Sequence, residues 1–299
     1  MQNTLIVITG PTGVGKTDTA IGVAKTLGCE IISADSRQIY RQIPITTAAP
    51  TPEEMAQVKH HFVAFKNLDE YYSAAQFEED VMQLLPEMFA KCPYAVMCGG
   101  SMMYIDAVCR GIDQIPTISS DVREATYRMY EEIGLEGMLE RLKVLDPEYY
   151  EVVDRKNTKR VIHALEICAE SGGTYTALRT GMAKERPFRI IKVALNVSRD
   201  ELFDRINHRV DKMIEAGMEQ EARSVYHLRH LNSLNTVGFK EMFAYFDGTM
   251  DFVTARERIK KNTRVYAKKQ LTWHAKDQSI VWTAPAQAHE TIMELIKDA

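Results

Sequence analysis

The 299-residue chain is long enough for one large or two moderate domains, and its 45% hydrophobic content is ample for a packed core. Its formal net charge of −4 excludes a general attraction to nucleic acid, so binding of that kind would need a local basic patch. Five cysteines without a C-x-x-C pair favour reduced thiols over disulfides or zinc ligands. Because the chain has no signal-peptide pattern and no run of 18 apolar residues, we expect a cytoplasmic protein that does not contact a membrane.

The first motif follows an apolar strand pattern at residues 5–8 and reads GPTGVGKT. It matches G-x-x-x-x-G-K-[ST], a loop whose backbone N–H groups point at an anion at the start of a helix. Lys16 would reach the outer phosphate, and the Thr17 hydroxyl would ligate Mg²⁺. The motif predicts a site for a diphosphate or a triphosphate and does not distinguish the two. It consists of Gly10, Pro11, Thr12, Gly13, Val14, Gly15, Lys16 and Thr17.

Helix and strand patterns alternate after this loop. A helix over residues 18–27 leads to a buried strand over 30–34, and a strand–helix–strand unit of this length predicts a parallel sheet. The remaining expected elements are an irregular stretch at 41–51, helices over 53–59 and 74–91, a strand over 94–98, helices over 121–145 and 148–171, a strand over 189–197, helices over 199–216, 220–230, 238–246 and 252–275, a strand over 279–283, and a helix from 286.

The character of the chain changes near Ile115 and Pro116, where strand patterns give way to amphipathic helices. The simplest account is an α/β fold with a P-loop NTPase-like parallel-sheet core and an inserted all-helical domain. We expect residues 1–115 to form the first part of the core and 116–185 the helical insertion. Residues 186–299 would complete the core and add basic C-terminal helices.

Two further polar positions follow buried strands. Asp35 ends the strand over 30–34, and Ser101 follows Gly99-Gly100 after the strand over 94–98. Ligands of parallel sheets bind at the carboxyl ends of the strands, so both side chains should face the same crevice as the P-loop. Asp35 could ligate magnesium, accept a proton in a group transfer, or cap a turn. No strand ends in the acidic pattern expected for NTP hydrolysis, so the P-loop could hold a diphosphate as a leaving group.

Arg205 and Arg209 are a candidate anion-binding pair. At i and i+4 they share one face of a helix, which suits two guanidinium groups that grip phosphate oxygens, although a solvated charged face is the alternative. His60 and His61 lack a third ligand at metal spacing, which favours packing over a metal site.

The long C-terminal helix is a candidate polyanion site, because seven basic residues lie between Arg256 and Lys269 against one acid. Three of them share one stripe, which we call the basic stripe: Lys261, Arg264 and Lys268. Trp273 and His274 at the end of this helix could stack on a base, although a Trp at that spacing is more often part of the core.

The chain resembles tRNA dimethylallyltransferases, bacterial enzymes that prenylate the adenosine next to the anticodon. The resemblance covers nearly the whole chain in eight ordered blocks: GPTGVGKT, SADSRQIY, HHFV, CGGSMMYI, KRVIHALE, RINHRVDKMIEAGM, TVGFKE and TRVYAKKQLTW. It implies transfer of the dimethylallyl group of dimethylallyl diphosphate to N6 of the adenosine at position 37, in tRNAs that read codons starting with U. Diphosphate is the implied second product. The implied partners are dimethylallyl diphosphate and the tRNA anticodon stem-loop, with Mg²⁺ as cofactor, and we expect a monomer.

Position by position, the resemblance implies a pyrophosphate cradle and three catalytic residues. The P-loop from Thr12 onward would hold pyrophosphate, with Mg²⁺ on Thr17. Asp35 would be the general base for N6, Ser101 (usually Thr in the family) would contact the oxygen that bridges the prenyl and diphosphate groups, and Arg209 would bind pyrophosphate. The residues implied to contact tRNA are Asp35, Ser36, Arg37, Gln38, Ser101, Arg123, Lys159, Arg160, Val161, Ile162, His163, Thr236, Val237, Gly238, Phe239, Lys240 and Glu241, and the basic stripe adds Lys261, Arg264 and Lys268.

The chain departs from the family pattern at two places. Residues 44–50 read PITTAAP where DIGTAKP is usual, and His163 stands where an arginine is usual. These departures weaken two expected tRNA or phosphate contacts and leave room for an altered substrate preference.

Three alternatives differ from a tRNA prenyltransferase in substrate or class. A prenyltransferase of free AMP, ADP or ATP would need neither a helical insertion nor a basic helix. A P-loop small-molecule kinase would also use Lys16 and Thr17, but the second acidic magnesium site is missing. A nonenzymatic nucleotide-binding module would leave Asp35 and Ser101 without a role.

Overall fold

The computed structural model describes residues 2–297, which divide into two compact units. Unit 1 comes from two segments, the described residues up to Arg110 and those from Glu185 onward. Unit 2 is the continuous segment Gly111–Lys184. Across residues 2–297, every helix is too short or too polar to span a bilayer.

Unit 1 contains a six-stranded parallel sheet in the order β3-β2-β4-β1-β5-β6. The strands are β1 (Thr4–Thr9), β2 (Ile31–Ser33), β3 (His60–His61), β4 (Tyr94–Cys98), β5 (Arg189–Leu195) and β6 (Ile280–Thr283). All six residues of β1 are buried, because this strand pairs with β4 on one side and β5 on the other. Helices cover both faces, as a wholly parallel sheet requires, and the predicted fold class is confirmed.

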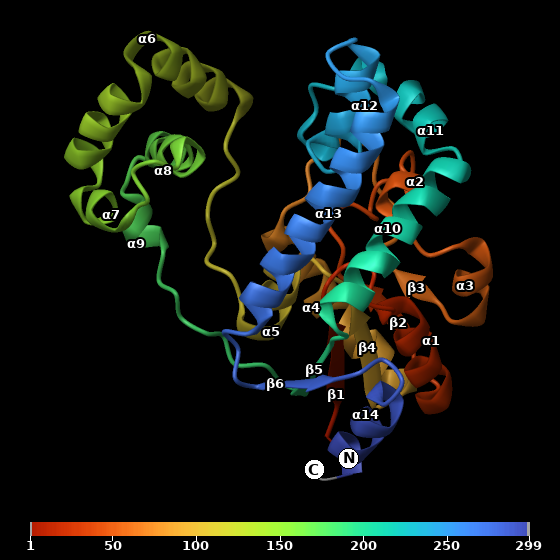
Figure 1. The fold of residues 1–299 in the computed structure, drawn as a ribbon. Coiled ribbons are helices and arrows are strands. Elements are labelled where there is room, and N and C mark those ends of the chain that lie inside the picture. The colour runs from red at the N-terminus through yellow and green to blue at the C-terminus, as the bar shows by residue number, and fades with distance from the viewer. Residues whose placement is uncertain (1, 298–299) are drawn as a thin grey trace. The chain divides into compact units, whose positions relative to one another are not determined.

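Alternate residues of β1 supply two separate hydrophobic clusters, because successive side chains of a strand point to opposite faces. Ile6 and Ile8 pack with α1 (Lys16–Leu27) and α14 (Ala288–Lys297). Leu5 and Val7 pack with α4 (Ala74–Lys91) and α5 (Met102–Arg110) on the other face. Figure 1 shows this three-layer arrangement.

Four helices of unit 1 gather beyond the carboxyl ends of the strands (Figure 1). They are α10 (Arg199–Glu215), α11 (Met218–Ser224), α12 (Phe239–Phe246) and α13 (Phe252–His274). A third hydrophobic cluster holds them together, with Phe239 fully buried among Val210, Met218 and Ile259. Helix α13 therefore runs from this cluster back towards the sheet, where it passes the P-loop.

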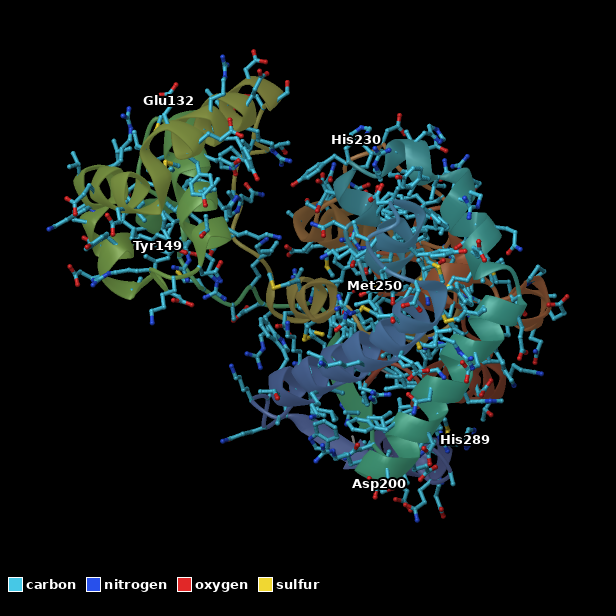
Figure 2. The ribbon with its side chains drawn as sticks, turned by 45° about the horizontal axis from the view of Figure 1, so that its top comes forward. Glu132, Tyr149, Asp200, His230, Met250 and His289 are labelled. Carbon is cyan, nitrogen blue, oxygen red and sulfur yellow. The ribbon has the colours of Figure 1, made fainter. Side chains whose placement is uncertain are left out.

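Unit 2 is helical and has its own hydrophobic cluster. Its helices are α6 (Ser120–Leu145), α7 (Pro147–Val152), α8 (Thr158–Ser171) and α9 (Tyr175–Leu178). Helix α6 bends at Gly134, whose φ of 65° is a left-handed conformation that favours glycine. Asp146 is buried and accepts hydrogen bonds from the backbone N–H groups of Tyr149 and Thr176. Figure 2 shows Tyr149 within this unit.

Several elements differ from the expected ones. Helix α5 follows Ser101, in a stretch for which no element was predicted. The stretch expected to be irregular contains the short helix α2 (Pro44–Thr47), and α3 (Pro52–Gln57) follows it. The helix expected over 148–171 is two helices, since the Asn157 side chain caps α8 by accepting the N–H of Arg160. The chain after α11 continues as two 3₁₀ turns, η1 (Tyr226–Leu228) and η2 (Asn232–Leu234).

Candidate active site

The P-loop turns sharply between β1 and α1. Gly10 has a φ of +136° and lies so close to β5 that a Cβ built on it would be 2.6 Å from the carbonyl oxygen of Leu195. Gly15, with a φ of 102°, immediately precedes the first residue of α1. The loop therefore delivers its backbone N–H groups to the N-terminus of a helix, where the helix dipole favours an anion.

Lys16 is partly buried, and its side chain turns back over the loop. Its Nζ donates to the carbonyl oxygens of Gly10 at 3.1 Å and Pro11 at 2.9 Å. Burial lowers the pKa of Lys16 to about 8, and the positive charge of Arg209 acts in the same direction. Lys16 is therefore still mostly protonated at neutral pH. A bound phosphate would place a negative charge next to the ammonium group and favour its protonated form.

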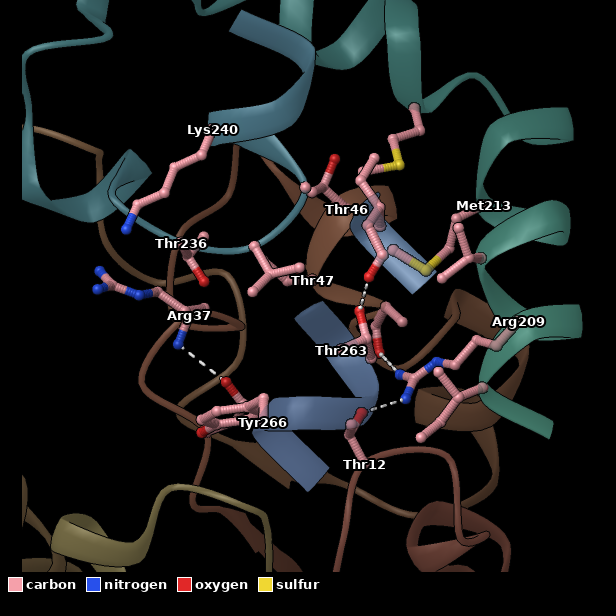
Figure 3. Close-up of a pocket in the computed structure, with 18 of the residues that line it drawn as sticks. Thr12, Arg37, Thr46, Thr47, Arg209, Met213, Thr236, Lys240, Thr263 and Tyr266 are labelled. Atoms are coloured by element: carbon pink, nitrogen blue, oxygen red, sulfur yellow. Dashed lines mark hydrogen bonds between the residues drawn. The ribbon is translucent and has the colours of Figure 1, made fainter. Parts of the chain in front are cut away.

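Arg205 and Arg209 have different environments, although they share one face of α10. Arg209 Nη1 donates to Thr12 Oγ1 at 2.9 Å and Nη2 to the carbonyl oxygen of Ala48 at 3.4 Å (Figure 3). Arg205 instead donates to the carbonyl oxygen of Val14 at 3.0 Å and pairs with a carboxylate on its own helix. Arg209 is therefore directed at the hydroxyl of Thr12, whereas Arg205 binds the loop backbone, and both side chains line the cavity around the P-loop.

Asp35 and Ser101 lie at the ends of neighbouring strands, β2 and β4. Asp35 Oδ1 accepts the backbone N–H of Arg37 at 2.9 Å and that of Gln38 at 3.4 Å. The described residues give Oδ2 no hydrogen bond, which leaves this oxygen able to accept a proton from a ligand. Ser101 Oγ accepts the backbone N–H of Ser36 at 2.8 Å, so the two strand ends are joined by a hydrogen bond.

Two cavities of unit 1 meet at Thr12, Asp35 and Arg209. The larger, about 810 Å³, is lined by the P-loop with Lys16 and Thr17. The smaller, about 400 Å³, has Ser101 in its lining and an apolar wall from α10 and α13. That wall consists of Ile206, Val210, Met213 and Ile259. An anion cradle therefore adjoins an apolar recess, with a carboxylate at the junction.

The segment around α12 divides into residues that line the smaller cavity and residues that hold the segment in place. Thr236, Val237, Gly238 and Lys240 line the cavity together with Ser36 and Arg37 (Figure 3). Phe239 is fully buried, so its expected contact with tRNA is wrong for the side chain. Glu241 is also buried and accepts the N–H of Gly238 at 2.7 Å, which makes it a brace of the turn.

The departures at residues 44–50 lie beside this cavity. The buried carboxylate of Glu221 accepts the backbone N–H groups of Ile45 and Thr46, each at 2.7 Å. Gln38 Nε2 donates to the carbonyl oxygens of Thr47 at 3.3 Å and Ala48 at 3.0 Å, and Gln38 lines the larger cavity. The segment is thus fixed by its backbone without the usual glycine and lysine.

The basic stripe does not line either cavity. Arg264 bonds to Asn207 and lies over the Phe203 ring, 5.7 Å from its centroid, and Lys268 Nζ lies 5.6 Å from the same centroid. Lys261 is exposed. Because Phe203 belongs to α10, the stripe occupies the flank of α13 that faces α10 and solvent. Nearby, Arg256 and Lys260 pair with Asp211 at 2.7 Å and 2.9 Å. The residues of α13 in the smaller cavity are Ile259, Thr263 and Tyr266.

Two buried side chains tie α13 to the P-loop and to the end of β1: Gln270, which sequence reasoning missed, and His274, which was expected to stack on a base. Gln270 Oε1 accepts the N–H of Thr12 at 2.8 Å, and its Nε2 donates to the carbonyl oxygen of Gly100 at 2.8 Å. His274 Nε2 lies 3.0 Å from Thr9 Oγ1, which itself donates to a backbone carbonyl. His274 must therefore donate this bond, and burial lowers its pKa to about 4. It is buried and neutral, so the expected stacking on a base is wrong.

These geometric features coincide with a match to a known family. The family model described as IPP transferase matches residues 38–277. The chain belongs to the IPP transferase family. A tRNA dimethylallyltransferase 2 from Parabacteroides distasonis is 55% identical over 294 residues, which is 98% of each chain. A tRNA dimethylallyltransferase 1 from Phocaeicola vulgatus is 54% identical over 99% of this chain and 98% of that protein.

A solved member of the IPP transferase family has the same fold. The crystal structure of a full-length tRNA isopentenylpyrophosphate transferase from Bacillus halodurans has a TM-score of 0.72 and 33% identity, and the match covers 99% of this chain and 96% of that one. The resemblance read from the eight sequence blocks is therefore confirmed.

In this member of the IPP transferase family, the expected tRNA residues of unit 2 fall into two groups. Arg123 on α6 and Lys159, Arg160 and His163 on α8 have exposed side chains. Val161 is fully buried and Ile162 is 9% exposed, and both belong to the hydrophobic cluster of unit 2. The contacts expected of these two side chains are therefore wrong. On α8 these two positions face the hydrophobic cluster, whereas the basic residues before and after them face outward.

The donor set around the P-loop fits magnesium better than a softer metal. Among residues 2–297, no three His, Cys, Asp or Glu side chains form a group that could hold a metal ion. The two adjacent histidines are engaged elsewhere: His60 Nδ1 lies 2.8 Å from the carbonyl oxygen of Val58, and His61 Nε2 lies 2.6 Å from Glu30. Thr17 lines the larger cavity next to Lys16. A lone hydroxyl suits Mg²⁺, which keeps several waters and takes its other ligands from phosphate oxygens.

Proposed function

We propose that this enzyme transfers the dimethylallyl group of dimethylallyl diphosphate to N6 of the adenosine at position 37, in tRNAs that read codons starting with U, and releases diphosphate. The observation that carries the proposal is the junction of the two cavities at Thr12, Asp35 and Arg209. It offers an anion cradle, an apolar recess and a proton acceptor next to one another. The tRNA dimethylallyltransferases that share more than half of its residues support the same substrate class.

The P-loop side would bind the diphosphate and stabilise it as it leaves. Backbone N–H groups of the loop, the Lys16 ammonium and the Arg209 guanidinium supply fixed positive partners for the charge that develops on the leaving group. Thr17 would hold Mg²⁺, which when bound supplies further neutralisation of phosphate charge. Enzymes of this class commonly use a metal, and the hydroxyl of Thr17 is well placed for one.

The apolar recess would hold the five-carbon chain while Asp35 accepts a proton. A bond forms between N6 and the first prenyl carbon as the bond from that carbon to the diphosphate oxygen breaks, and the electron pair of the broken bond leaves with diphosphate. The proton released from N6 passes to Asp35, whose Oδ2 carries no hydrogen bond from the described residues. Ser101 would orient the bridging oxygen.

The adenosine would have to leave its stack to enter the smaller cavity, as in other enzymes that act on a base. Arg37, Thr236 and Lys240 line that cavity and would contact the flipped nucleotide and its neighbours. Unit 2 would clamp the anticodon stem-loop through Arg123, Lys159, Arg160 and His163, with the protein acting as a monomer. The basic stripe would add long-range attraction for tRNA from the neighbouring flank of α13.

The proposal is tested with labelled dimethylallyl diphosphate, Mg²⁺ and, in parallel reactions, bulk tRNA, AMP or ATP. We expect label in tRNA only and no consumption of ATP. Label in AMP or ATP would favour the mononucleotide prenyltransferase. Steady release of orthophosphate from ATP that depends on tRNA would overturn the transferase in favour of a kinase or NTPase.

A further inference from the structure

Gln270 is a buried neutral side chain whose amide is bonded at both ends to the phosphate-binding region. Its Oε1 accepts a hydrogen bond from the N–H of Thr12, and its Nε2 donates one to the carbonyl oxygen of Gly100, each at 2.8 Å. The side chain is 1% exposed, although it borders the larger cavity. One turn further along α13, His274 bonds to Thr9 at the end of β1. Helix α13 is thereby bonded to the end of β1 and to the residues that follow β4. These bonds hold the Gln270 side chain next to the P-loop.

The Gln270 amide stands at the same end of the cradle as the Lys16 ammonium. A Cβ built on Gly100 would lie 2.4 Å from Gln270 Nε2 and 3.7 Å from Lys16 Nζ. Lys16 itself bonds to carbonyls in the first two residues of the motif. The lysine of a P-loop lies between the β and γ phosphates of a bound nucleotide, so the γ phosphate of a triphosphate would have to arrive beside Gln270, whereas a diphosphate can occupy the inner positions.

A third phosphate would find this end of the cradle already occupied. The N–H of Thr12 is bonded to Gln270, and the Thr12 hydroxyl accepts from Arg209. Gln270 Oε1 would present a lone pair to the incoming anion, and removal of the Thr12 hydrogen bond would leave a buried carbonyl oxygen without a donor. The later N–H groups of the loop, from Gly13 to Thr17, would then hold the two phosphates of a diphosphate.

We propose that Gln270 is a specificity-determining residue that sets the number of phosphates the site accepts. It closes the outer end of the cradle to a triphosphate and leaves room for a diphosphate. The inference rests on the proposed function for the identity of the prenyl substrate, and it makes a separate claim about phosphate number. It also explains how a P-loop can serve a group transfer in a cell that is rich in ATP.

Isothermal titration calorimetry on the full chain tests this with inorganic diphosphate and inorganic triphosphate, in Mg²⁺ and without tRNA. The wild-type protein should bind diphosphate at least about tenfold more tightly than triphosphate. Gln270→Ala removes the amide and frees the Thr12 N–H, so the affinity ratio should shift towards triphosphate by about tenfold. Gln270→Asn keeps an amide on a shorter stem and should give an intermediate ratio. Thr272→Ala, an exposed position on the same helix, should leave the ratio unchanged.

Two results would overturn the proposal. One is a wild-type protein that binds triphosphate as tightly as diphosphate, a measurement that needs no variant to fold. The other is a Gln270→Ala or Gln270→Asn protein in which both affinities change by the same factor, because a residue that only shapes the loop would affect both anions alike. The titrations involve no transfer reaction, so a failure of the proposed transferase activity would be seen separately, in the labelled-prenyl assay.

Discussion

The two flanks of α13 differ in how they contribute to the site. The flank towards the P-loop carries uncharged side chains, Thr263, Tyr266 and Gln270, and these line the cavities or bond to the phosphate loop. The flank towards α10 carries the basic stripe, which lies over Phe203 and faces solvent. On α13, neutral residues thus make the direct contacts with the site, and the charged residues of the basic stripe act from a distance.

This difference shows why a count of charges does not locate an anion site. The positions of α13 next to the P-loop can hold amide and hydroxyl groups whose hydrogen bonds are satisfied. An unpaired lysine buried there would cost several kcal/mol of folding free energy, on the order of the desolvation of one charge. Lysine and arginine consequently gather on the exposed flank, where their solvation is retained. The experiments below separate the two flanks.

The largest effect should come from the cavity side. Asp35→Ala should reduce turnover by roughly 10²–10⁴-fold, the usual contribution of a positioned proton acceptor, while diphosphate binding persists. Asp35→Asn should behave in the same way, because the amide keeps the shape but accepts no proton. Single-turnover transfer of labelled prenyl groups to tRNA provides the measurement, with exposed Asp69→Ala as the matched control. Near wild-type turnover in both Asp35 variants would remove this residue from the mechanism.

The next effect is a pH dependence of diphosphate binding. The protonated ammonium binds the anion, and burial lowers the pKa of Lys16 to about 8, so the free site loses its charge above that pH. The dissociation constant for inorganic diphosphate should be nearly flat below pH 8 and rise about tenfold for each further pH unit. In Lys16→Arg the guanidinium stays charged, and the rise should disappear. A wild-type curve that stays flat to pH 10 would contradict the assignment.

The smallest effect compares the lining of the smaller cavity with the basic stripe by the salt dependence of tRNA affinity. Each phosphate contact contributes about 0.7–0.9 to the slope of log affinity against log salt. Arg37→Gln with Lys240→Gln, both in the cavity lining, should flatten the slope by about 1.5. Replacing the three residues of the basic stripe with Gln should flatten it by less than about one unit, because their attraction is long-range and screened. A larger loss in the stripe variant would mean that tRNA follows the α10 flank of α13.

Sequence patterns predicted the parts of the site that are local. The P-loop, Asp35 and Ser101 each follow an apolar run, so their placement at strand ends follows from the parallel-sheet topology. The helix α4 and the strand β4 have the predicted bounds, since their apolar periodicity is strong. In these two segments nearly all the residues that become buried are apolar, so the local pattern alone indicates where the element begins and ends.

The remainder depends on long-range contacts that no local pattern encodes. Gln270 lies 258 residues after Thr12, and within its own helix it is one polar residue among many. The helical spacing of Gln270 and His274 at i and i+4 was available in the sequence, but only burial distinguishes them from the exposed Lys269. The inward orientation of Phe239 likewise follows from the cluster formed by α10 to α13.

The sheet order also constrains how the chain folds while it is being synthesised. Strand β1 is made early, yet its partner on one side, β5, is encoded about 180 residues later. At about 5–20 residues per second, β1 waits roughly ten to forty seconds with the backbone groups of one edge unpaired. Unit 2 emerges as a continuous segment within that interval and can complete its own cluster first. A nascent chain stalled before Arg189 would thus contain a finished helical unit and an incomplete sheet, whose unpaired strand edge is open to aggregation.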